Sequence, residues 1–223
     1  MEEKALVVFS GGQDSTTCLY WALKNFAHVE TVTFDYGQRH LIELEAVKKI
    51  AALAKVPSVI LKESALAQLG GNSLTADMPI EESQNGAPPN TFVPGRNIIF
   101  LTLAAAYAYQ RGISNLVTGV CQTDFSGYPD CRRNTIDSLE QTLTLGMDRT
   151  FKIHTPLMWL TKAQTVDLAL EVGALDALAY SHTCYNGTLP PCGECPACKL
   201  RAKGFAEAKV ADPLIERCRK ELR

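Results

Sequence analysis

The residues from Ser10 to Ser15 read Ser-Gly-Gly-Gln-Asp-Ser and are of the types that bind phosphate. They follow a short apolar, β-branched run and precede a helical pattern, so a Gly-rich turn joins a strand to a helix. Glycine lets the backbone approach a ligand closely, and successive N–H groups at such a turn form an anion-binding nest. The helix adds unpaired N–H groups and the positive end of its dipole. We therefore interpret the segment as a phosphate-binding loop.

This loop differs from a Walker A loop, because it contains no lysine and lacks the Gly-x4-Gly-Lys-Ser/Thr spacing. Its acidic residue, Asp14, would lie close to phosphate oxygens. A divalent cation such as Mg²⁺ between carboxylate and phosphate would stabilise that arrangement. An ordinary Gly-Gly turn before a capped helix is the alternative, but oxygen-bearing side chains surround the glycines where ligands are needed.

Four cysteines lie close together in the pattern Cys184-x7-Cys192-x2-Cys195-x2-Cys198. Cys-x-x-Cys turns place thiolates on one cation, and four thiolates form a closed tetrahedral Zn²⁺ site, which is structural because no position stays open. We expect a single zinc ion per chain, joining the loop after Tyr180 to the start of the last main helix. An iron–sulfur cluster and a redox-active dithiol or disulfide remain alternatives.

A zinc-binding module could instead bind nucleic acid, which requires a basic surface near the cluster. Lys199, Arg201 and Lys203 are offset there by Glu194, Glu207 and Asp212. The formal net charge of −2 also provides no general attraction for phosphates of a polynucleotide. We therefore expect no nucleic-acid partner.

An arginine in the middle of the chain begins a mostly apolar helix. Arg96 follows Val93-Pro94-Gly95, and a cation in the first turn opposes the helix dipole. An anionic ligand such as an ATP phosphate would explain its position. A solvated surface arginine is the alternative.

The segment 119–132 is rich in groups that recognise flat, acidic molecules. A carboxylate accepts N–H bonds from a guanine-like amidine edge, an aromatic ring stacks on a flat ring, and arginine pairs with a carboxylate. The segment suits an acidic purine-like substrate, although an ordinary polar turn explains its composition equally well. The residues in question are Asp124, Phe125, Tyr128, Asp130 and Arg132.

The 223 residues, 46% of them hydrophobic, fit one domain with a small appendage. We divide the chain into an α/β ligand-binding domain at 1–180 and a zinc-binding helical region at 181–223. The N-terminus does not resemble a signal peptide, and no apolar run approaches the roughly 18 residues of a membrane span. We expect a cytoplasmic protein that acts on small molecules as a homodimer and does not bind membranes.

Strand-like and helix-like segments alternate, which favours a doubly wound, mostly parallel, Rossmann-like α/β sheet with helices on both faces. Ligands bind such sheets at the carboxyl ends of the strands. The loops Ser10–Ser15, Asp35–Arg39 and Gly119–Arg132 all leave carboxyl ends and should converge on one cleft. The pattern predicts strands at 4–9, 29–35, 59–61 and 115–119, helices at 39–54, 96–111, 134–147, 162–173 and 196–209, and a long loop at 64–93.

The loop Ser-Gly-Gly-Gln-Asp-Ser resembles the signature of the PP-loop ATP pyrophosphatases. The resemblance implies an adenine nucleotide alpha hydrolase-like fold and cleavage of ATP between its α and β phosphates. Such enzymes adenylate a substrate oxygen, and a nucleophile then displaces AMP. The ATP-binding residues implied are Phe9, Ser10, Gly11, Gly12, Gln13, Asp14, Ser15, Thr16, Thr17, Cys18 and Leu19.

Further motifs occur in order along the chain: Val-Thr-Phe-Asp-Tyr-Gly-Gln-Arg-His, Phe-Val-Pro-Gly-Arg-Asn, Gly-Val-Cys-Gln-Thr-Asp-Phe-Ser-Gly-Tyr-Pro-Asp-Cys-Arg, Thr-Pro-Leu-Met-Trp-Leu-Thr-Lys-Ala, and Thr-Cys-Tyr-Asn-Gly with Cys-Gly-Glu-Cys-Pro-Ala-Cys. With them the chain resembles the 7-cyano-7-deazaguanine synthase family of the queuosine pathway from residue 5 to about 208. The family's carbon–nitrogen ligases convert 7-carboxy-7-deazaguanine, ammonia and ATP into the nitrile through adenylated acid and amide intermediates. The resemblance implies zinc ligands at Cys184, Cys192, Cys195 and Cys198, and deazaguanine binding by Asp124, Tyr128, Asp130 and Arg132.

That reaction needs cations at the phosphates and the developing oxyanion, and the candidates are Mg²⁺ held through Asp14, with Arg96 and Lys162. Lys162 could equally be a surface lysine in the first turn of its helix. No protein nucleophile is required, so Cys18 and Cys121 are assigned to packing or to the lining of the pocket. The histidines His40, His154 and His182 are interpreted as structural rather than catalytic. Another PP-loop adenylating enzyme, such as a tRNA thiolase or an amidating synthetase, is the alternative function.

Overall fold

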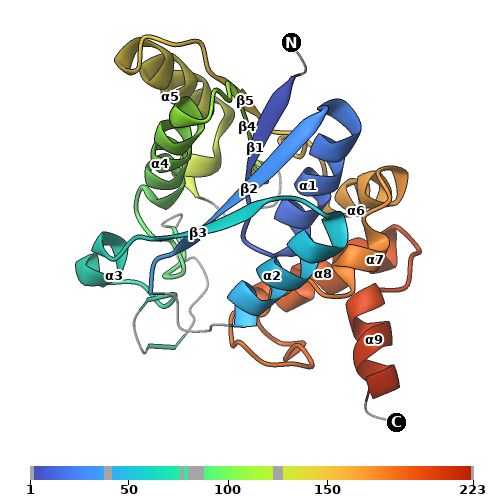
Figure 1. The fold of residues 1–223 in the computed structure, drawn as a ribbon. Coiled ribbons are helices and arrows are strands. Elements are labelled where there is room, and N and C mark those ends of the chain that lie inside the picture. Colours follow the sequence, from blue (N-terminus) through green and yellow to red (C-terminus); the bar gives the residue numbers. More distant parts are fainter. Residues whose placement is uncertain (1–2, 38–41, 76–77, 80–87, 123–127, 222–223) are drawn as a thin grey trace.

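The computed structural model describes residues 3–37, 42–75, 78–79, 88–122 and 128–221 (Figure 1). In chain order, the elements are β1 (Lys4–Val8), α1 (Gln13–Asn25), β2 (His28–Asp35), α2 (Ile42–Ala54), β3 (Ser58–Lys62), α3 (Ala65–Leu69), α4 (Arg96–Gln110), β4 (Asn115–Val117), the 3₁₀ turn η1 (Pro129–Cys131), α5 (Arg133–Gly146), β5 (Lys152–His154), α6 (Lys162–Glu171), α7 (Leu175–Leu178), α8 (Pro196–Glu207) and α9 (Pro213–Glu221).

Within the described residues the strands form one parallel sheet in the order β3-β2-β1-β4-β5. The central strand β1 is apolar throughout its middle, and Ala5, Leu6 and Val7 are each 0% exposed. A strand in which successive side chains are all buried must be covered on both faces. The doubly wound parallel α/β fold predicted from the alternating pattern is therefore confirmed.

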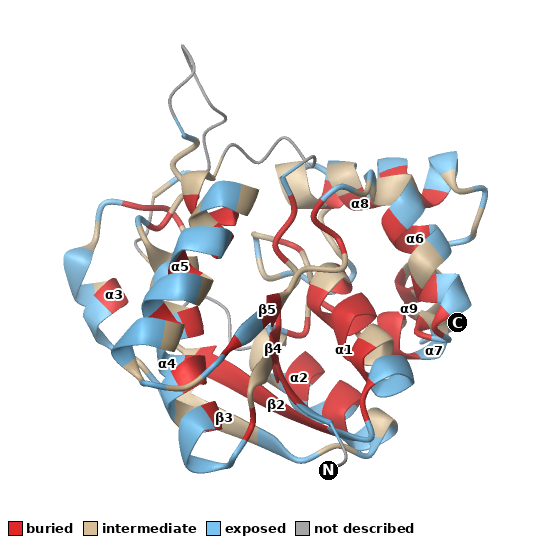
Figure 2. Ribbon diagram, turned by 90° about the horizontal axis from the view of Figure 1, so that it is seen from above, coloured by how far each residue is buried: buried red, intermediate tan, exposed pale blue. Residues whose placement is uncertain are grey.

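The two faces of the sheet carry separate apolar cores. Leu6 packs in the core that α4 and α5 cover, whereas Ala5 and Val7 pack in the core that α1 and α2 cover. Successive side chains of a strand point to opposite faces, which explains this division. Figure 1 shows α4 and α5 on one side of the sheet and α1 and α2 on the other. In Figure 2 the outer sides of α4 and α5 are exposed, whereas α1 is mostly buried, because α6 and α7 pack against it.

The last helices gather beside α1, on the same side of the sheet (Figure 1). A third apolar core joins α6 to α8, with Val166 and Ala169 against Phe205. Gly204 makes this close packing possible, because a Cβ at that position would lie 2.9 Å from the Cβ of Lys162. The buried Arg201 of α8 binds Asp212 through two N–H groups, at 2.6 and 2.8 Å, and so fixes the chain that leads into α9.

Several predicted boundaries are wrong. The strand predicted at 115–119 ends at Val117, because Gly119 already packs against the beginning of α1. The sequence pattern missed β5, in which Ile153 is the buried residue, and α9, whose surface is mostly charged. The segment 64–93, predicted as a loop, contains α3, and the helix predicted at 196–209 is observed as α8. Short or highly polar elements give too little periodicity to be recognised.

The order of the strands reverses between β1 and β4, because the chain runs from β1 outward to β3 and then returns to β4 on the other side. Open α/β sheets bind ligands at such a switch point, outside the carboxyl ends of the strands. The loops after β1 and β4 meet here. Among the described residues, none of the helices combines the length and the apolarity that spanning a membrane requires.

Candidate functional site

The loop after β1 is held rigidly before it turns into α1. Phe9 is 1% exposed, its N–H donates to Val32 O at 2.8 Å, and its carbonyl accepts from Thr33 Oγ1 at 2.6 Å. Gly11 has φ +76°, and a Cβ there would lie 3.0 Å from the carbonyl oxygen of Glu43. Only glycine fits this conformation and this close approach to α2 without strain.

The side chains of the loop fold back on its own backbone. Ser10 and Ser15 exchange a hydrogen bond between their hydroxyl oxygens at 3.0 Å, and the Ser10 N–H donates to Ser15 Oγ at 3.2 Å. Thr16 Oγ1 donates to Gly12 O at 2.7 Å. On the other side, a Cβ at Gly119 would lie 3.1 Å from the Ser15 nitrogen, so the chain after β4 packs directly on the start of α1.

The later residues of the predicted ATP-binding segment lie in the core. Thr16, Thr17, Cys18 and Leu19 are each 0% exposed. They anchor α1 to the sheet and thereby hold the loop. The predicted convergence of the loops after β1 and β4 is thus observed, whereas residues 38–39 of the loop after β2 lie outside the described residues.

Buried polar atoms without a hydrogen-bond partner lie on and beside the loop. Among the described residues they include Gln13 Nε2, Asp14 Oδ1 and Thr183 Oγ1. Thr183 belongs to the site because its Cγ2 would lie 3.7 Å from a Cβ at Gly12. A buried polar atom left unpaired costs about 1–3 kcal/mol. An amide donor, a carboxylate oxygen and a hydroxyl in this state fit a polar ligand, and the carboxylate oxygen fits a cation bound to that ligand.

Lys162 is not a surface lysine. Its side chain is 12% exposed, and its Nζ lies 2.6 Å from Asp14 Oδ2. The lysine begins α6, and Thr161 caps this helix: Thr161 Oγ1 accepts from the Gln164 N–H, and Gln164 Oε1 accepts from the Thr161 N–H. The cap fixes the first turn of α6, and the packing of α6 on α8 aims the lysine at the phosphate loop. Two residues that are 148 positions apart in the sequence therefore form one charged pair.

Arg96 lies among tyrosines rather than in solvent. Its guanidinium donates to the Tyr36 hydroxyl at 3.3 Å and lies 5.9 Å from the centre of that ring. Burial works against its charge, but the nearby Tyr36, Tyr128 and Tyr185 phenols raise the pKa of Arg96 above its ordinary value. Arg96 is therefore a permanently charged group near tyrosines from three segments of the chain, which suits an anionic ligand.

One residue that sequence reasoning did not single out is Glu43, in the first turn of α2. It is partly buried opposite Arg96 and Tyr36. Burial raises the pKa of Glu43 to about 7, and the opposing charge of Arg96 reduces that effect. The sequence gives no signal for this, because the neighbouring Glu45 also lies in the first turn and is exposed.

The predicted substrate residues are distributed unevenly. Asp124 and Phe125 lie outside the described residues. The Tyr128 hydroxyl shares a hydrogen bond of 2.6 Å with Thr91 Oγ1, and its ring lies 5.5 Å from that of Phe92. Arg132 is exposed at the start of α5.

Asp130 has a structural partner. Its side chain is buried, and Oδ2 accepts from Asn97 N at 2.9 Å, in the first turn of α4. This bond pairs an N–H that the helix itself leaves unpaired, and it connects the segment 128–132 to the helix that carries Arg96. The described contacts of Asp130 thus hold α4 in position, and its contact with a base stays a prediction.

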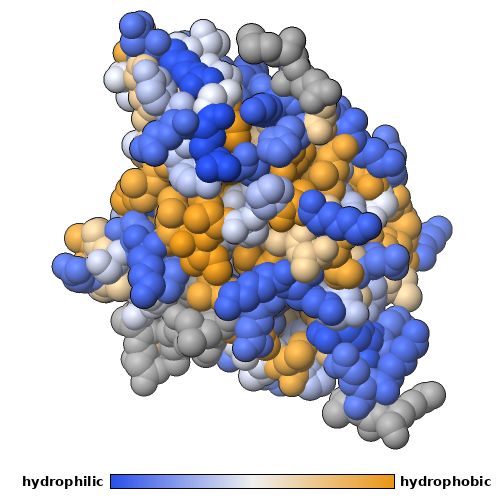
Figure 3. All heavy atoms as spheres, in the orientation of Figure 1, coloured by the Kyte–Doolittle hydropathy of each residue, from blue (hydrophilic) through white to orange (hydrophobic). Residues whose placement is uncertain are grey.

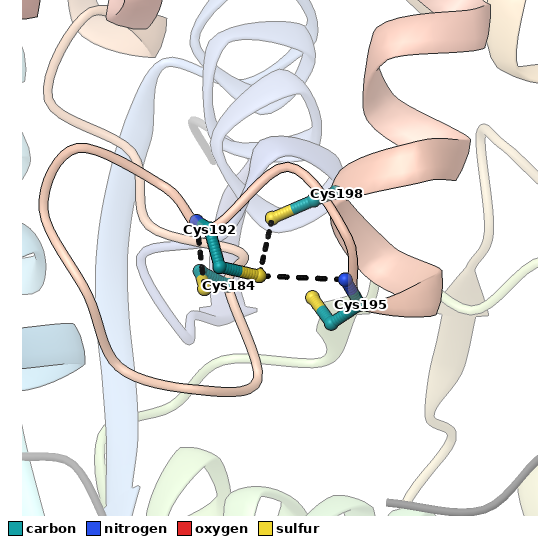
Figure 4. Close-up of side chains that lie close together, drawn as sticks. All are labelled: Cys184, Cys192, Cys195 and Cys198. Atoms are coloured by element: carbon teal, nitrogen blue, oxygen red, sulfur yellow. Dashed lines mark hydrogen bonds between the residues drawn. The ribbon is translucent and has the colours of Figure 1, made fainter.

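The four cysteines form one cluster. Their sulfur atoms all lie within 4.8 Å of one another, with Cys192 Sγ 3.9 Å from Cys198 Sγ. Figure 4 shows Cys195 and Cys198 projecting from the beginning of α8 toward Cys184 and Cys192 of the preceding loop. Ligands bound at about 2.3 Å on a tetrahedral ion lie about 3.8 Å apart, so the arrangement fits a metal.

Neighbouring N–H groups prepare these sulfur atoms for a cation. Cys192 N donates to Cys184 Sγ at 3.5 Å, and Cys195 N donates to Cys192 Sγ at 3.3 Å. Burial opposes ionisation of Cys184, but the hydrogen bonds from Cys192 and Thr188 lower its pKa to about 6. Hydrogen bonds of this kind orient the thiolates that would bind a metal ion.

The cysteine loop touches the phosphate loop directly. The His182 N–H donates to Gly11 O at 2.9 Å, and the His182 ring Nε2 lies 3.1 Å from Cys184 O. His182 is buried and therefore bridges the two loops. Together with the contact between Gly204 and Lys162, this gives the cysteine region two connections to the phosphate site.

His154, Cys18 and Cys121 lie in packed parts of the structure. The His154 ring packs against Trp21 and Phe26, and burial lowers its pKa. Cys18 and Cys121 are buried in the core beneath the loop. His40 lies outside the described residues.

Comparison with known proteins supports one family. The chain matches the family described as "Queuosine biosynthesis protein QueC" over residues 4–209. It is 64% identical to the 7-cyano-7-deazaguanine synthase of Chromobacterium violaceum over 225 aligned positions, covering 99% of this chain and 96% of that protein. The protein of the same name from Bacillus subtilis is 56% identical over 211 positions, with 94% of this chain and 96% of that protein covered.

Solved structures with little sequence similarity share the fold. A 4-thiouridine synthetase in complex with RNA and bound ATP superposes with a TM-score of 0.53 at 18% identity, and the chain spans half of that protein's length. A predicted subunit of a tRNA methyltransferase from Methanocaldococcus jannaschii gives a TM-score of 0.51 at 15% identity, covering 76% of this chain and 75% of that one. At these identities the likeness concerns the fold alone.

Proposed function

Because the chain belongs to the QueC family of queuosine biosynthesis proteins, we propose that it is a carbon–nitrogen ligase that converts 7-carboxy-7-deazaguanine and ammonia to 7-cyano-7-deazaguanine at the expense of ATP. The observation that carries the proposal is the phosphate loop at the switch point of the sheet. That loop presents unpaired Gln13 and Asp14 atoms, and the Lys162 ammonium closes one side of it.

The reaction requires activation of an oxygen twice. A carboxylate resists attack by ammonia because oxide is a poor leaving group. Transfer of the adenylyl group to that oxygen makes AMP the leaving group, and ammonia then gives the amide. Loss of the amide oxygen as a second AMP gives the nitrile. A site that binds ATP in one orientation can perform both activations.

The charged residues divide the work between the ends of the phosphate chain. The Lys162 ammonium contacts Asp14 at the start of α1 and stabilises charge that develops on the phosphates during adenylyl transfer. Arg96, beside Tyr36, binds the carboxylate of the substrate or a phosphate oxygen. Asp14 Oδ1 and the phosphates would hold Mg²⁺, which neutralises phosphate charge when bound.

We assign the cysteine cluster to a structural Zn²⁺, a single ion per chain. Four sulfur ligands leave no open position, so the ion would not take part in the reaction. The cluster ties the loop from Cys184 to the beginning of α8. We treat 1–180 as the ATP-binding α/β domain and 181–223 as a helical region that the metal organises.

For the base of the substrate we propose the segment 119–132. Tyr128 and Arg132 flank the described end of this segment, Asp124 is the candidate for the amidine edge, and Asp130 holds the segment on α4. The placement of Tyr128 near Arg96 supports this assignment, because the two would then meet the ring and its carboxylate.

The surface supports association of two copies. Figure 3 shows apolar side chains gathered between α4 and β3, and Ile98 and Leu103 of α4 are 39% and 37% exposed. A homodimer would cover such a surface. We propose a cytoplasmic homodimer that acts on small molecules.

The test is product analysis by mass spectrometry. The chain is incubated with 7-carboxy-7-deazaguanine, ammonium chloride and MgATP, and with each component omitted in turn. We expect the nitrile together with AMP and pyrophosphate. Formation of ADP and phosphate without AMP, or no nitrile from a folded, metal-loaded protein, contradicts the proposed function.

A further inference from the structure

Glu43 occupies a particular place in the site. Its backbone carbonyl lies against the phosphate loop, 3.0 Å from where a Cβ of Gly11 would be. Its carboxylate lies close enough to Arg96 of α4 and to Tyr36, which follows β2, to interact electrostatically with both. Among the described residues, none donates a hydrogen bond to this carboxylate or forms an ion pair with it. Glu43 is therefore a partly buried acid whose carboxylate oxygens can still accept hydrogen bonds or a proton.

The other described carboxylates nearby are engaged. Asp14 pairs with Lys162 at 2.6 Å, and Asp130 accepts from the Asn97 N–H at 2.9 Å. Asp35, at the end of β2, lies 3.5 Å from the N–H of Gly37. Asp14 is paired through Oδ2 and leaves Oδ1 without a donor, whereas no donor of the described chain holds either oxygen of Glu43.

We propose that Glu43 is the general base that accepts protons from the nitrogen atom as the nitrile is built. The inference rests on the function proposed above, in which a nitrogen nucleophile loses its protons one after another. Arg96 opposite Glu43 would hold the carboxyl group of the substrate, so the attacking nitrogen would lie between the two residues.

The lone pair of ammonia forms the C–N bond to the adenylated carboxyl carbon, the C–O bond to AMP breaks, and AMP leaves with the electron pair. One N–H proton passes to the Glu43 carboxylate. After adenylation of the amide oxygen and release of pyrophosphate, the nitrogen loses its remaining protons to the same carboxylate as C≡N forms and AMP leaves. Between transfers Glu43 releases each proton to water, to which it is partly exposed.

The electrostatic setting suits a base that works near neutral pH. Burial raises the pKa of Glu43 to about 7, and Arg96 and Tyr36 are the titratable groups of the described elements that face it. An acid or base is most effective when its pKa lies near the working pH, and positioned proton transfer contributes about 10² to 10⁴ in rate.

The experiment separates activation from proton transfer. Exchange of labelled pyrophosphate into ATP, dependent on 7-carboxy-7-deazaguanine and without ammonia, reports adenylation, in which no N–H proton moves. Nitrile formation reports the nitrogen steps. Glu43→Gln keeps the size of the side chain and removes the base, whereas Glu43→Asp keeps a shorter base. Glu45→Gln is the matched control, because Glu45 lies in the same first turn but is exposed.

We expect Glu43→Gln to keep exchange within about threefold of wild type and to lose about 100-fold in nitrile formation. The rise of the nitrile rate with pH near neutrality should disappear in Glu43→Gln and persist in Glu43→Asp and Glu45→Gln. Equal nitrile rates in Glu43→Gln and Glu45→Gln, or equal losses of exchange and nitrile in Glu43→Gln, would overturn the inference. Absence of both activities in the wild type would instead overturn the proposed function, and the inference with it.

Discussion

The phosphate loop and the cysteine loop are held in place by different means. The phosphate loop is continuous with the core: Phe9 is 1% exposed, Thr16 is 0% exposed, and both are hydrogen bonded to the backbone around them. The apolar cluster around the cysteine loop consists chiefly of the cysteines themselves, with Tyr185 and Ala197 packed beside them. Packing therefore forms the first loop before any ligand binds, whereas the second would depend on the metal proposed for its cysteines.

The comparison also shows that one region supports the other. The backbone N–H of His182, two residues before Cys184, donates to Gly11 O of the phosphate loop. Gly204 of α8 packs on Lys162. A metal bound to the four cysteines would thus stabilise the contacts that His182 and Gly204 make with Gly11 and Lys162. Variants in each region should separate these roles.

The largest expected effect is on stability, in Cys195→Ser. Removing one of four thiolates should release the metal and with it several kcal/mol of folding free energy. About 2–4 °C is lost per kcal/mol in a chain of this length, so the melting temperature should fall by about 10 °C or more. Calorimetry and elemental analysis of the purified variant measure both quantities.

Cys218→Ser is the control for this variant, since Cys218 is buried in α9 and lies outside the cluster. It should keep its metal. Zinc retained in Cys195→Ser at an unchanged melting temperature, or iron in the wild type, would contradict the zinc assignment.

In contrast to Cys195→Ser, Asp14→Asn should abolish activity and leave the stability of the fold nearly unchanged. The variant loses the charge that holds Lys162 and binds the cation, with little change of volume. Turnover should fall by about 10³-fold, the range for loss of an electrostatic group at a reacting centre. The melting temperature should stay within a few degrees of wild type, as it should in the control Asp167→Asn on the exposed side of α6. Near-normal turnover of Asp14→Asn would show that the role assigned to it is wrong.

The two acids of the substrate segment should behave differently. Asp124→Ala should weaken binding of 7-carboxy-7-deazaguanine by about 100-fold with little change in ATP affinity, because a charged hydrogen-bond partner of the base is lost. Asp130→Ala should mainly destabilise the protein, by about 1–3 kcal/mol, because Asn97 N loses its acceptor. Calorimetric titration with each ligand, and thermal unfolding, distinguish the two, and equal losses for both ligands in Asp124→Ala would contradict the assignment.

Gly204→Ala tests the contact between the two regions. Its methyl group would lie 2.9 Å from Lys162 Cβ, so α6 and α8 must separate or Lys162 must move. We expect about a tenfold loss of turnover and about 1–3 kcal/mol of stability, with the metal retained. Gly146→Ala is the control, because nothing lies within 4 Å of a Cβ there, and it should change neither turnover nor metal content. Wild-type turnover in Gly204→Ala would show that this contact does not position Lys162.

The smallest effect is a pH dependence of stability. The pKa of Glu43 is raised to about 7 in the folded chain, so its protonated form is favoured by folding. Stability that depends on this proton is present below the unfolded pKa and is lost as pH rises from about 4.3 to about 7. Relative to Glu43→Gln, the wild type should therefore lose about 1–3 kcal/mol between pH 5 and pH 8. Urea titrations at both pH values measure the difference, and a constant difference would show that the environment of Glu43 is not the one described.

Long, periodic segments were predictable from the sequence, and short or polar ones were not. The apolar run at α4 and the β-branched run at β1 each contain many apolar residues, and their pattern predicts a buried helix and a buried strand. β5 has three residues and α9 is mostly charged, so neither carries enough of a pattern. In the site, the spacing of Cys192, Cys195 and Cys198 predicted their cluster, because a Cys-x-x-Cys turn is a local structure.

The sequence by itself predicted the turn at Ser10–Ser15 between β1 and α1, the cysteine cluster, the fold class and the family, since each depends on neighbouring residues or on the repetition of a pattern. The tertiary structure decided which distant groups meet. The pairing of Lys162 with Asp14, the tyrosines around Arg96, the burial of Glu43 and the attachment of Asp130 to α4 all join segments far apart in the chain. The charge and pKa of a side chain depend on the neighbours that folding supplies, and spacing along the sequence does not contain that information.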